Sequence, residues 1–187
     1  DAIPLGPFPY FPSVPLSGKP ESRPTLLFFG RVISYKGLEI LLRAFGQVRK
    51  STACRLLIAG EGNLSPYKEL LAQLSDVEIV NRWIGENEIG DFFARSDLVV
   101  LPYTSASQSG VIPIAAAFGL PVIATRTGGL SEQVVDGVSG WLVLPGDVDA
   151  LAAAILEALT TPAVARQRGQ ALADRYERLF GWERNAR

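Results

Sequence analysis

Residues 25–48 read TLLFFGRVISYKGLEILLRAFGQV, and this stretch decides the fold. It opens with an apolar run at 26–29 and passes through a loop that begins and ends in glycine. Apolar residues then recur at the spacing of an amphipathic helix, on a stripe made by Leu38, Leu41, Leu42, Phe45 and Val48. We therefore expect a buried strand, a short loop, and a helix that covers the strand.

The same order of strand, loop and helix recurs along the chain. Short β-rich runs stand at residues 26–29, 55–59, 77–80, 98–101, 122–124 and 141–144. One further helix is expected to begin with Ser65 as N-cap and Pro66 as its first residue. Others are expected at 86–95, 111–118, 130–135, 148–159 and 163–179. Apolar strands joined through helices predict an α/β fold, a doubly wound Rossmann-like domain over residues 25–187 with a parallel sheet of about six strands.

Residues 1–24 are expected to be an irregular lead-in, because seven of the thirteen prolines fall there. Aromatic residues alternate with these prolines, which suggests that the lead-in packs on a surface.

Composition excludes several classes of function. With 18 basic and 19 acidic side chains, the net charge of −1 gives no extended field for nucleic acid. The absence of histidine excludes a His-based triad or zinc site. One cysteine, Cys54, rules out a disulfide framework and favours a reducing compartment. No apolar run of about 20 residues is present. We expect a cytoplasmic protein, with the inner face of the membrane left open for the full-length protein. Because methionine is also absent, the chain is read as an internal fragment.

Two loops at the expected carboxyl edge of the sheet suit phosphate groups. In loop 30–37, Arg31 and Lys36 lie between a strand and a helix N-terminus, where cations and orphan N–H groups can both bind an anion. In loop 102–110, the backbone of Gly110 and Val111 and the hydroxyl of Ser109 form a second predicted cradle. Together the two cradles suit a diphosphate.

The loop at 60–65 only partly matches a dinucleotide fingerprint. It begins Gly60-Glu61-Gly62, but Ser65 stands where a third glycine is expected, and the loop follows the second strand. An NAD-dependent oxidoreductase is therefore weakly supported.

The order of these motifs resembles a known family. The motifs are Gly30-Arg31 with Lys36-Gly37, Ala59-Gly60-Glu61-Gly62, and residues 97–102, 119–125, 128–132 and 136–140. They are similar to the donor-binding domain of group 1 retaining glycosyltransferases of the GT-B fold. The likeness runs over residues 26–159, and its specificity lies in the ordered set.

The resemblance implies a function and a set of site residues. It implies transfer of a sugar from a nucleotide diphosphate sugar to an acceptor, with retention and with no metal or other cofactor. Arg31 and Lys36 would stabilise the leaving diphosphate, and the segment Arg82 to Gly85 would border the base. The implied donor-binding residues are Gly30, Glu61, Ile84, Gly85, Gln108, Ser109, Gly110, Val111 and Glu132.

One departure concerns two glutamates that the family commonly places eight positions apart. Their places fall near Ala106 and Ile114, and neither residue is acidic. Gln108 and Glu132 are the available substitutes for sugar and ribose recognition.

The other half of such an enzyme, an N-terminal domain that binds the acceptor, is expected to lie outside this chain. The fragment is then expected to bind a donor without completing catalysis. The lead-in, with Phe180 and Trp182, is expected to contact that half, and an exposed apolar patch could pair two copies in a crystal. A sugar-nucleotide epimerase-like domain and a non-catalytic nucleotide-binding domain remain as alternatives.

Overall fold

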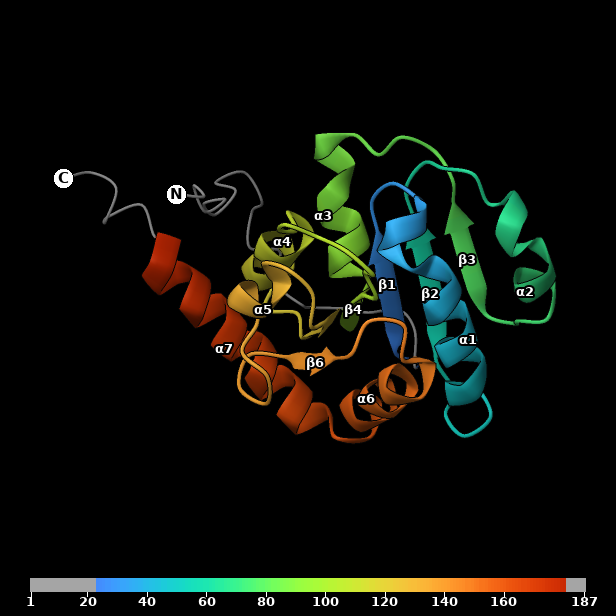
Figure 1. Ribbon diagram of the computed structural model, residues 1–187. Helices are drawn as coiled ribbons and strands as arrows, with labels where there is room; N and C mark the ends of the chain where they lie inside the picture. Colours follow the sequence, from blue (N-terminus) through green and yellow to red (C-terminus); the bar gives the residue numbers. More distant parts are fainter. Residues whose placement is uncertain (1–22, 181–187) are drawn as a thin grey trace.

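The computed structural model describes residues 23–180, and its centre is one sheet of six parallel strands (Figure 1). The order across the sheet is β3-β2-β1-β4-β5-β6. This confirms the predicted doubly wound α/β fold, because the chain leaves the centre in one direction and then returns to build the other half. The bounds are β1 Thr25–Phe29, β2 Arg55–Ala59, β3 Val77–Val80, β4 Leu98–Leu101, β5 Val122–Thr125 and β6 Trp141–Val143.

Helices cover both faces of the sheet because successive strand residues point to opposite sides. Leu26 and Phe28 of β1 join a core with α1 Leu38–Val48, α2 Lys68–Ala72 and α6 Val148–Thr160. Leu27 between them joins the core on the other face. That core is completed by α3 Glu86–Ala94, α4 Val111–Ala117, α5 Leu130–Gln133, and Leu172 and Tyr176 of α7 Pro162–Phe180. Two short 3-10 helices, η1 Ser34–Lys36 and η2 Ser65–Tyr67, lie in the loops.

The stripe predicted on the first helix forms as expected. Leu38, Leu41 and Phe45 of α1 are fully buried, so each contributes about 1.5–3 kcal/mol of transfer free energy relative to exposure. The strand–loop–helix unit is therefore a stable support for the loop that it encloses.

Two local predictions are wrong. Ser65 is not an N-cap, because it is the first residue of η2 and its N–H donates to Oδ1 of Asn63 at 2.9 Å. The asparagine two residues upstream makes the turn that the serine was expected to make, and Pro66 is thus the second residue of η2.

Helix α5 is also shorter than the predicted 130–135. It ends at Gln133, because Val134 is extended with φ −121° and ψ 131°. The hydroxyl of Ser139 then accepts the N–H of Val135, so a local side-chain bond replaces a helical one, and Asp136 accepts the N–H of Leu142 in β6.

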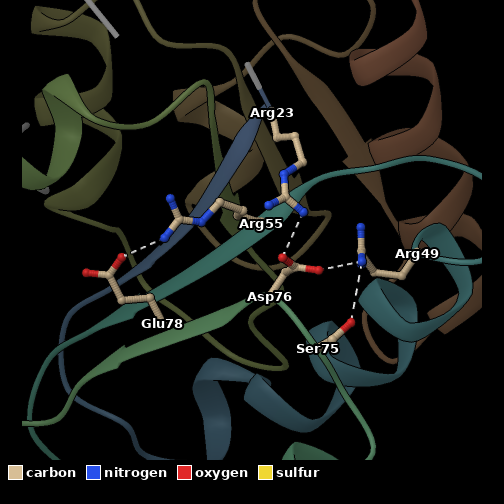
Figure 2. Close-up of polar contacts among 6 residues, drawn as sticks. All are labelled: Arg23, Arg49, Arg55, Ser75, Asp76 and Glu78. Atoms are coloured by element: carbon tan, nitrogen blue, oxygen red, sulfur yellow. Dashed lines mark hydrogen bonds and ion pairs between the residues drawn. The ribbon is translucent and has the colours of Figure 1, made fainter. Parts of the chain in front are cut away.

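The amino edge of the sheet is closed by ion pairs, as Figure 2 shows. Asp76, directly before β3, lies between Arg23 and Arg49, and its bond to Arg23 is 2.9 Å long. Glu78 accepts from Arg55 at 3.2 Å, as Figure 2 shows. It also accepts from Arg95 at 2.8 Å. Each arginine of this edge therefore has a carboxylate partner.

Within residues 23–180, no single helix has both the length and the apolar composition needed to span a membrane. The bent pair of α6 and α7 meets those two criteria only when both helices are taken together. The predictions for residues 1–22 and Trp182 lie outside the described residues, as does the side chain of Phe180.

Candidate functional site

The loop after β1 holds the ammonium group of Lys36 at the carboxyl end of the sheet. Nζ of Lys36 lies 3.4 Å from the carbonyl oxygen of Phe29 and 5.2 Å from the centre of the Tyr103 ring. Gly30, with φ +99°, leaves room for it, because a Cβ atom at this position would be 2.6 Å from that Nζ. The glycine that ends the strand is therefore what allows the lysine to reach this place.

The electrostatics of this loop are those of an anion site. Burial, and secondarily the positive charge of Arg31, lowers the pKa of Lys36 from 10.5 to about 8. Among residues 23–180, no carboxylate lies within ion-pair distance of Arg31 or Lys36. An anion bound here would replace the solvation that Lys36 has lost and would raise its pKa again.

The loops at this edge contact one another through their backbones. Gly37, with φ +69°, approaches Pro102 so closely that a Cβ atom would be 1.9 Å from the carbonyl oxygen of Pro102. Further along loop 102–110, the carbonyl oxygen of Ala106 would be 1.7 Å from a Cβ atom on Gly128, in the loop after β5. Loop 102–110 is thus enclosed between the loops after β1 and β5.

Tyr103 joins the two predicted cradles. Its side chain is 3% exposed, its ring lies beneath Lys36, and its carbonyl oxygen accepts the hydroxyl of Thr125 at 2.5 Å. Burial raises the pKa of Tyr103 to about 12, although a side-chain hydrogen bond with Ser109 acts in the other direction. This tyrosine stays neutral near pH 7 and serves as a rigid support.

The second cradle, at 109–111, differs in part from its predicted form. The hydroxyl of Ser109 is buried and accepts the N–H of Val111 at 3.2 Å, so both groups are used within the protein. Gly110 is open, because a Cβ atom on it would meet no atom within 4 Å. Of the three residues, Gly110 therefore offers the most accessible backbone.

The segment predicted to border the base is a braced loop. Arg82 forms an ion pair with Glu88 and donates to the carbonyl oxygen of Trp83 at 2.9 Å. Glu88 also accepts the N–H of Gly85, and these bonds, led by the one from Arg82, lower the pKa of Glu88 to about 2. Ile84 is buried beneath the loop, whereas the indole of Trp83 is 71% exposed.

The remaining predicted residues lie around this centre. Glu61 is exposed, and its carbonyl oxygen accepts the N–H of Val32 at 2.8 Å. Gln108 is half-buried beside Gly129, and the side chain of Glu132 is exposed on α5. Ile114, at the place of one missing glutamate, is 7% exposed and packs in the apolar core. The roles of all these residues stay predictions.

Sequence reasoning missed Tyr103 and Gln133, whose amide bonds to both backbone groups of Ser109. A signal for Gln133 existed. It is a polar residue three positions after buried Leu130 and next to buried Val134, on the inward side of a short helix.

Within the described residues, no three His, Cys, Asp or Glu side chains are grouped so that they could bind a metal ion. The expectation of a metal-independent reaction stays a prediction, since other groups of the complete site could contribute.

A family model described as Glycosyl transferases group 1 matches residues 23–161. The chain belongs to this family. The match includes all six strands and every predicted site residue, so the loop geometry above is that of a group 1 glycosyltransferase domain.

Curated relatives extend well beyond this chain. It is 32% identical over 171 residues to a glycogen synthase from Mycobacterium tuberculosis, covering 88% of this chain and 41% of that protein. It is 35% identical over 178 residues to a D-inositol 3-phosphate glycosyltransferase from Arthrobacter, covering 90% of this chain and 42% of that protein. The chain thus spans about two fifths of the length of these relatives.

Solved structures agree on the fold. Sucrose-phosphate synthase from Thermosynechococcus elongatus matches with a TM-score of 0.77 at 30% identity, over 87% of this chain and 43% of that one. HepE from Anabaena, in complex with UDP-glucose, matches with a TM-score of 0.76 at 25% identity, over 85% of this chain and 45% of that one. Both likenesses cover the six-stranded domain described above.

Proposed function

We propose that this chain is the donor-binding part of a group 1 glycosyltransferase that transfers a sugar from a nucleoside diphosphate sugar to an acceptor, with retention. The observation that carries the proposal is Lys36, half-buried over Tyr103 with Arg31 nearby and with no carboxylate partner among residues 23–180. A protein that keeps a desolvated cation without a counter-ion is prepared to bind an anion at that place.

The proposed catalytic role of Lys36 and Arg31 follows from the negative charge that develops on the leaving group. As the bond between the sugar and the diphosphate breaks, negative charge grows on the departing phosphate oxygens, and fixed cations stabilise that charge without reorganising. A charged hydrogen bond from Lys36 or Arg31 would contribute about 1.5–3 kcal/mol. We assign to both residues the stabilisation of the leaving diphosphate, with no metal ion required.

Gly110 supports the second phosphate contact. The space beside its Cα is open in the protein, so a phosphate oxygen can approach the backbone closely. Ser109 has an indirect role, because its hydroxyl accepts the N–H of Val111 and fixes the direction of the following turn.

The donor is proposed to be a nucleoside diphosphate sugar, and UDP is the first nucleotide to test. This choice follows the 25% identical Anabaena protein, whose structure contains UDP-glucose. Loop 82–85 is proposed to border the base of the nucleotide. Gln108 and Glu132 are proposed to make the sugar and ribose contacts in place of the missing glutamates.

We further propose that this chain alone binds donor without transferring sugar, because the acceptor-binding part would lie in the remaining three fifths of such a protein. A cytoplasmic location is proposed with it, consistent with the single buried thiol of Cys54.

A ligand screen by thermal shift tests this function. UDP, GDP, ADP, the matching nucleosides and NAD are added to the chain and to the Gly110→Val variant. A diphosphate should raise the melting temperature of the wild type more than its nucleoside does, because ligand that binds only the folded state stabilises it. Gly110→Val should keep its fold, since the added atoms enter open space, and should lose this shift. A shift with NAD alone, or an equal shift in the variant, contradicts the proposal.

A further inference from the structure

The side-chain amide of Gln133 bonds to both backbone groups of one residue in the donor loop. Its Oε1 accepts the N–H of Ser109 at 2.8 Å, and its Nε2 donates to the carbonyl oxygen of Ser109 at 3.0 Å. The same Nε2 donates to the hydroxyl oxygen of Tyr176 at 3.0 Å. The amide thereby uses one acceptor and two donors.

Only one orientation of this amide is compatible with its surroundings. If oxygen and nitrogen were exchanged, the amino group would face the N–H of Ser109, and two donors would oppose each other. Ser109 is 5% exposed, so its backbone groups cannot turn to water instead. The contact is therefore specific for an uncharged amide of this length.

The position of Ser109, which Gln133 fixes, affects both phosphate cradles. Its hydroxyl accepts the N–H of Val111, which sets the turn around Gly110. Its side chain is also hydrogen-bonded to that of Tyr103, whose ring supports Lys36. A displacement of Ser109 would thus disturb the backbone cradle directly and the lysine through one intermediate.

Tyr176 connects the same amide to α7. Its side chain is 5% exposed, and α7 lies close to the turn after α4, where a Cβ atom on Gly169 would be 2.2 Å from the carbonyl oxygen of Gly119. Figure 1 shows α5, which ends in Gln133, beside α7. The position of α7 and the position of the donor loop are consequently linked through one side chain.

We propose that Gln133 is a positioning residue, which orders loop 102–110 for the diphosphate before the donor arrives and couples that loop to α7. The role in donor binding rests on the proposed function. The ordering of the loop does not, since it concerns the ligand-free protein.

The test combines amide hydrogen exchange with calorimetric titration of UDP and inorganic pyrophosphate. Three variants of the 187-residue chain are compared with the wild type. Gln133→Leu removes all three bonds at similar volume, Tyr176→Phe removes the hydroxyl through which Gln133 is linked to α7, and Gln170→Leu is the matched control. Gln170 is exposed on α7 and bonds only to nearby Asp174.

In Gln133→Leu, the Ser109 amide should exchange at least about ten times faster, because its buried acceptor is lost. Affinity for UDP and pyrophosphate should fall about tenfold at a temperature where the variant is fully folded. Tyr176→Phe should show a change of about two- to threefold, and Gln170→Leu none.

The outcomes separate the two claims. Unchanged exchange at Ser109 in Gln133→Leu overturns the ordering role, and faster exchange with unchanged affinity overturns the positioning role. If the wild type binds neither UDP nor pyrophosphate, the proposed function fails, and with it the part of this inference that concerns the donor. The exchange rates still decide whether Gln133 orders the loop. A lower melting temperature with normal affinity would mark Gln133 as merely structural.

Discussion

At the amino edge of the sheet, Arg23 and Arg49 share the carboxylate of Asp76, whereas Arg31 and Lys36 at the carboxyl edge have no such partner within residues 23–180. The contrast is specific to the loop after the central strand. Arg82 and Arg126, in outer loops of the carboxyl edge, do pair with Glu88 and Asp136. Of these six cations, only Arg31 and Lys36 lack an ion-pair partner within residues 23–180.

The difference separates stability from binding. The partly exposed ion pairs at the amino edge each contribute on the order of 1 kcal/mol, and they form without any ligand. A half-buried ammonium without a partner lowers stability, and this cost is recovered only when an anion binds. The carboxyl edge is therefore the part of the molecule that is organised around a ligand.

The largest expected effect comes from breaking the backbone contact at the carboxyl edge. Gly37→Ala puts a Cβ atom 1.9 Å from the carbonyl oxygen of Pro102 at φ +69°, and should destabilise the protein by about 2–4 kcal/mol. Gly137→Ala is the matched control, because its φ of +73° is similar but its surroundings are open. It should cost only about 1–2 kcal/mol. Urea unfolding measures both, and equal losses would mean that the Gly37 contact has no energetic weight.

A smaller effect is expected at the amino edge. Asp76→Asn keeps the shape of the side chain and its tolerance of φ +60°, but removes the charge between Arg23 and Arg49. Stability should fall by about 1 kcal/mol, with less loss at high salt, and affinity for UDP should not change. Reduced UDP affinity in this variant would show that the two edges are not independent.

The smallest effect, and one of opposite sign, is expected for the unpaired lysine. Its folded pKa of about 8 lies below its ordinary value of 10.5, so between these limits the unfolded chain binds more protons. The contribution of Lys36 to stability should therefore rise as pH increases from about 8 to 10.5.

Lys36→Met should thus raise the ligand-free melting temperature at pH 7 by about 2–4 °C, for a gain near 1 kcal/mol after allowance for partial exposure. The advantage should shrink as pH rises above about 8 and should be only a small fraction of its pH 7 value at pH 10. Thermal unfolding at both pH values checks this, and a variant less stable than wild type at pH 7 would refute the desolvation argument.

Much of the fold could be predicted because strand positions depend on local pattern. The apolar run 55–59 matches β2 exactly in its bounds, and the stripe from Leu38 to Val48 matches α1. Helix ends were less predictable. The end of α5 at Gln133 depends on hydrogen bonds made by Asp136 and Ser139 further along the chain.

Site residues could be predicted only where the residue types in a motif indicate the chemistry. Arg31 and Lys36 stood out as cations between a strand and a helix. Nothing in the sequence showed that the Lys36 ammonium would lie over Tyr103, because those residues are 67 positions apart and meet only after β1 and β4 pair. The pattern around Gln133 placed it on the inward side of its helix, but its partner Ser109, 24 residues away, could not be predicted.

The central claim is that Lys36 binds a phosphate group of the donor. Calorimetric titration of UDP and of uridine into the wild type, Lys36→Ala and Lys50→Ala tests it most directly, with Lys50 as an exposed lysine just after α1. We predict that UDP affinity falls about 10- to 100-fold in Lys36→Ala alone, while uridine binding is the same in all three proteins. Equal weakening of UDP and uridine, or undiminished UDP binding in Lys36→Ala, would contradict the account.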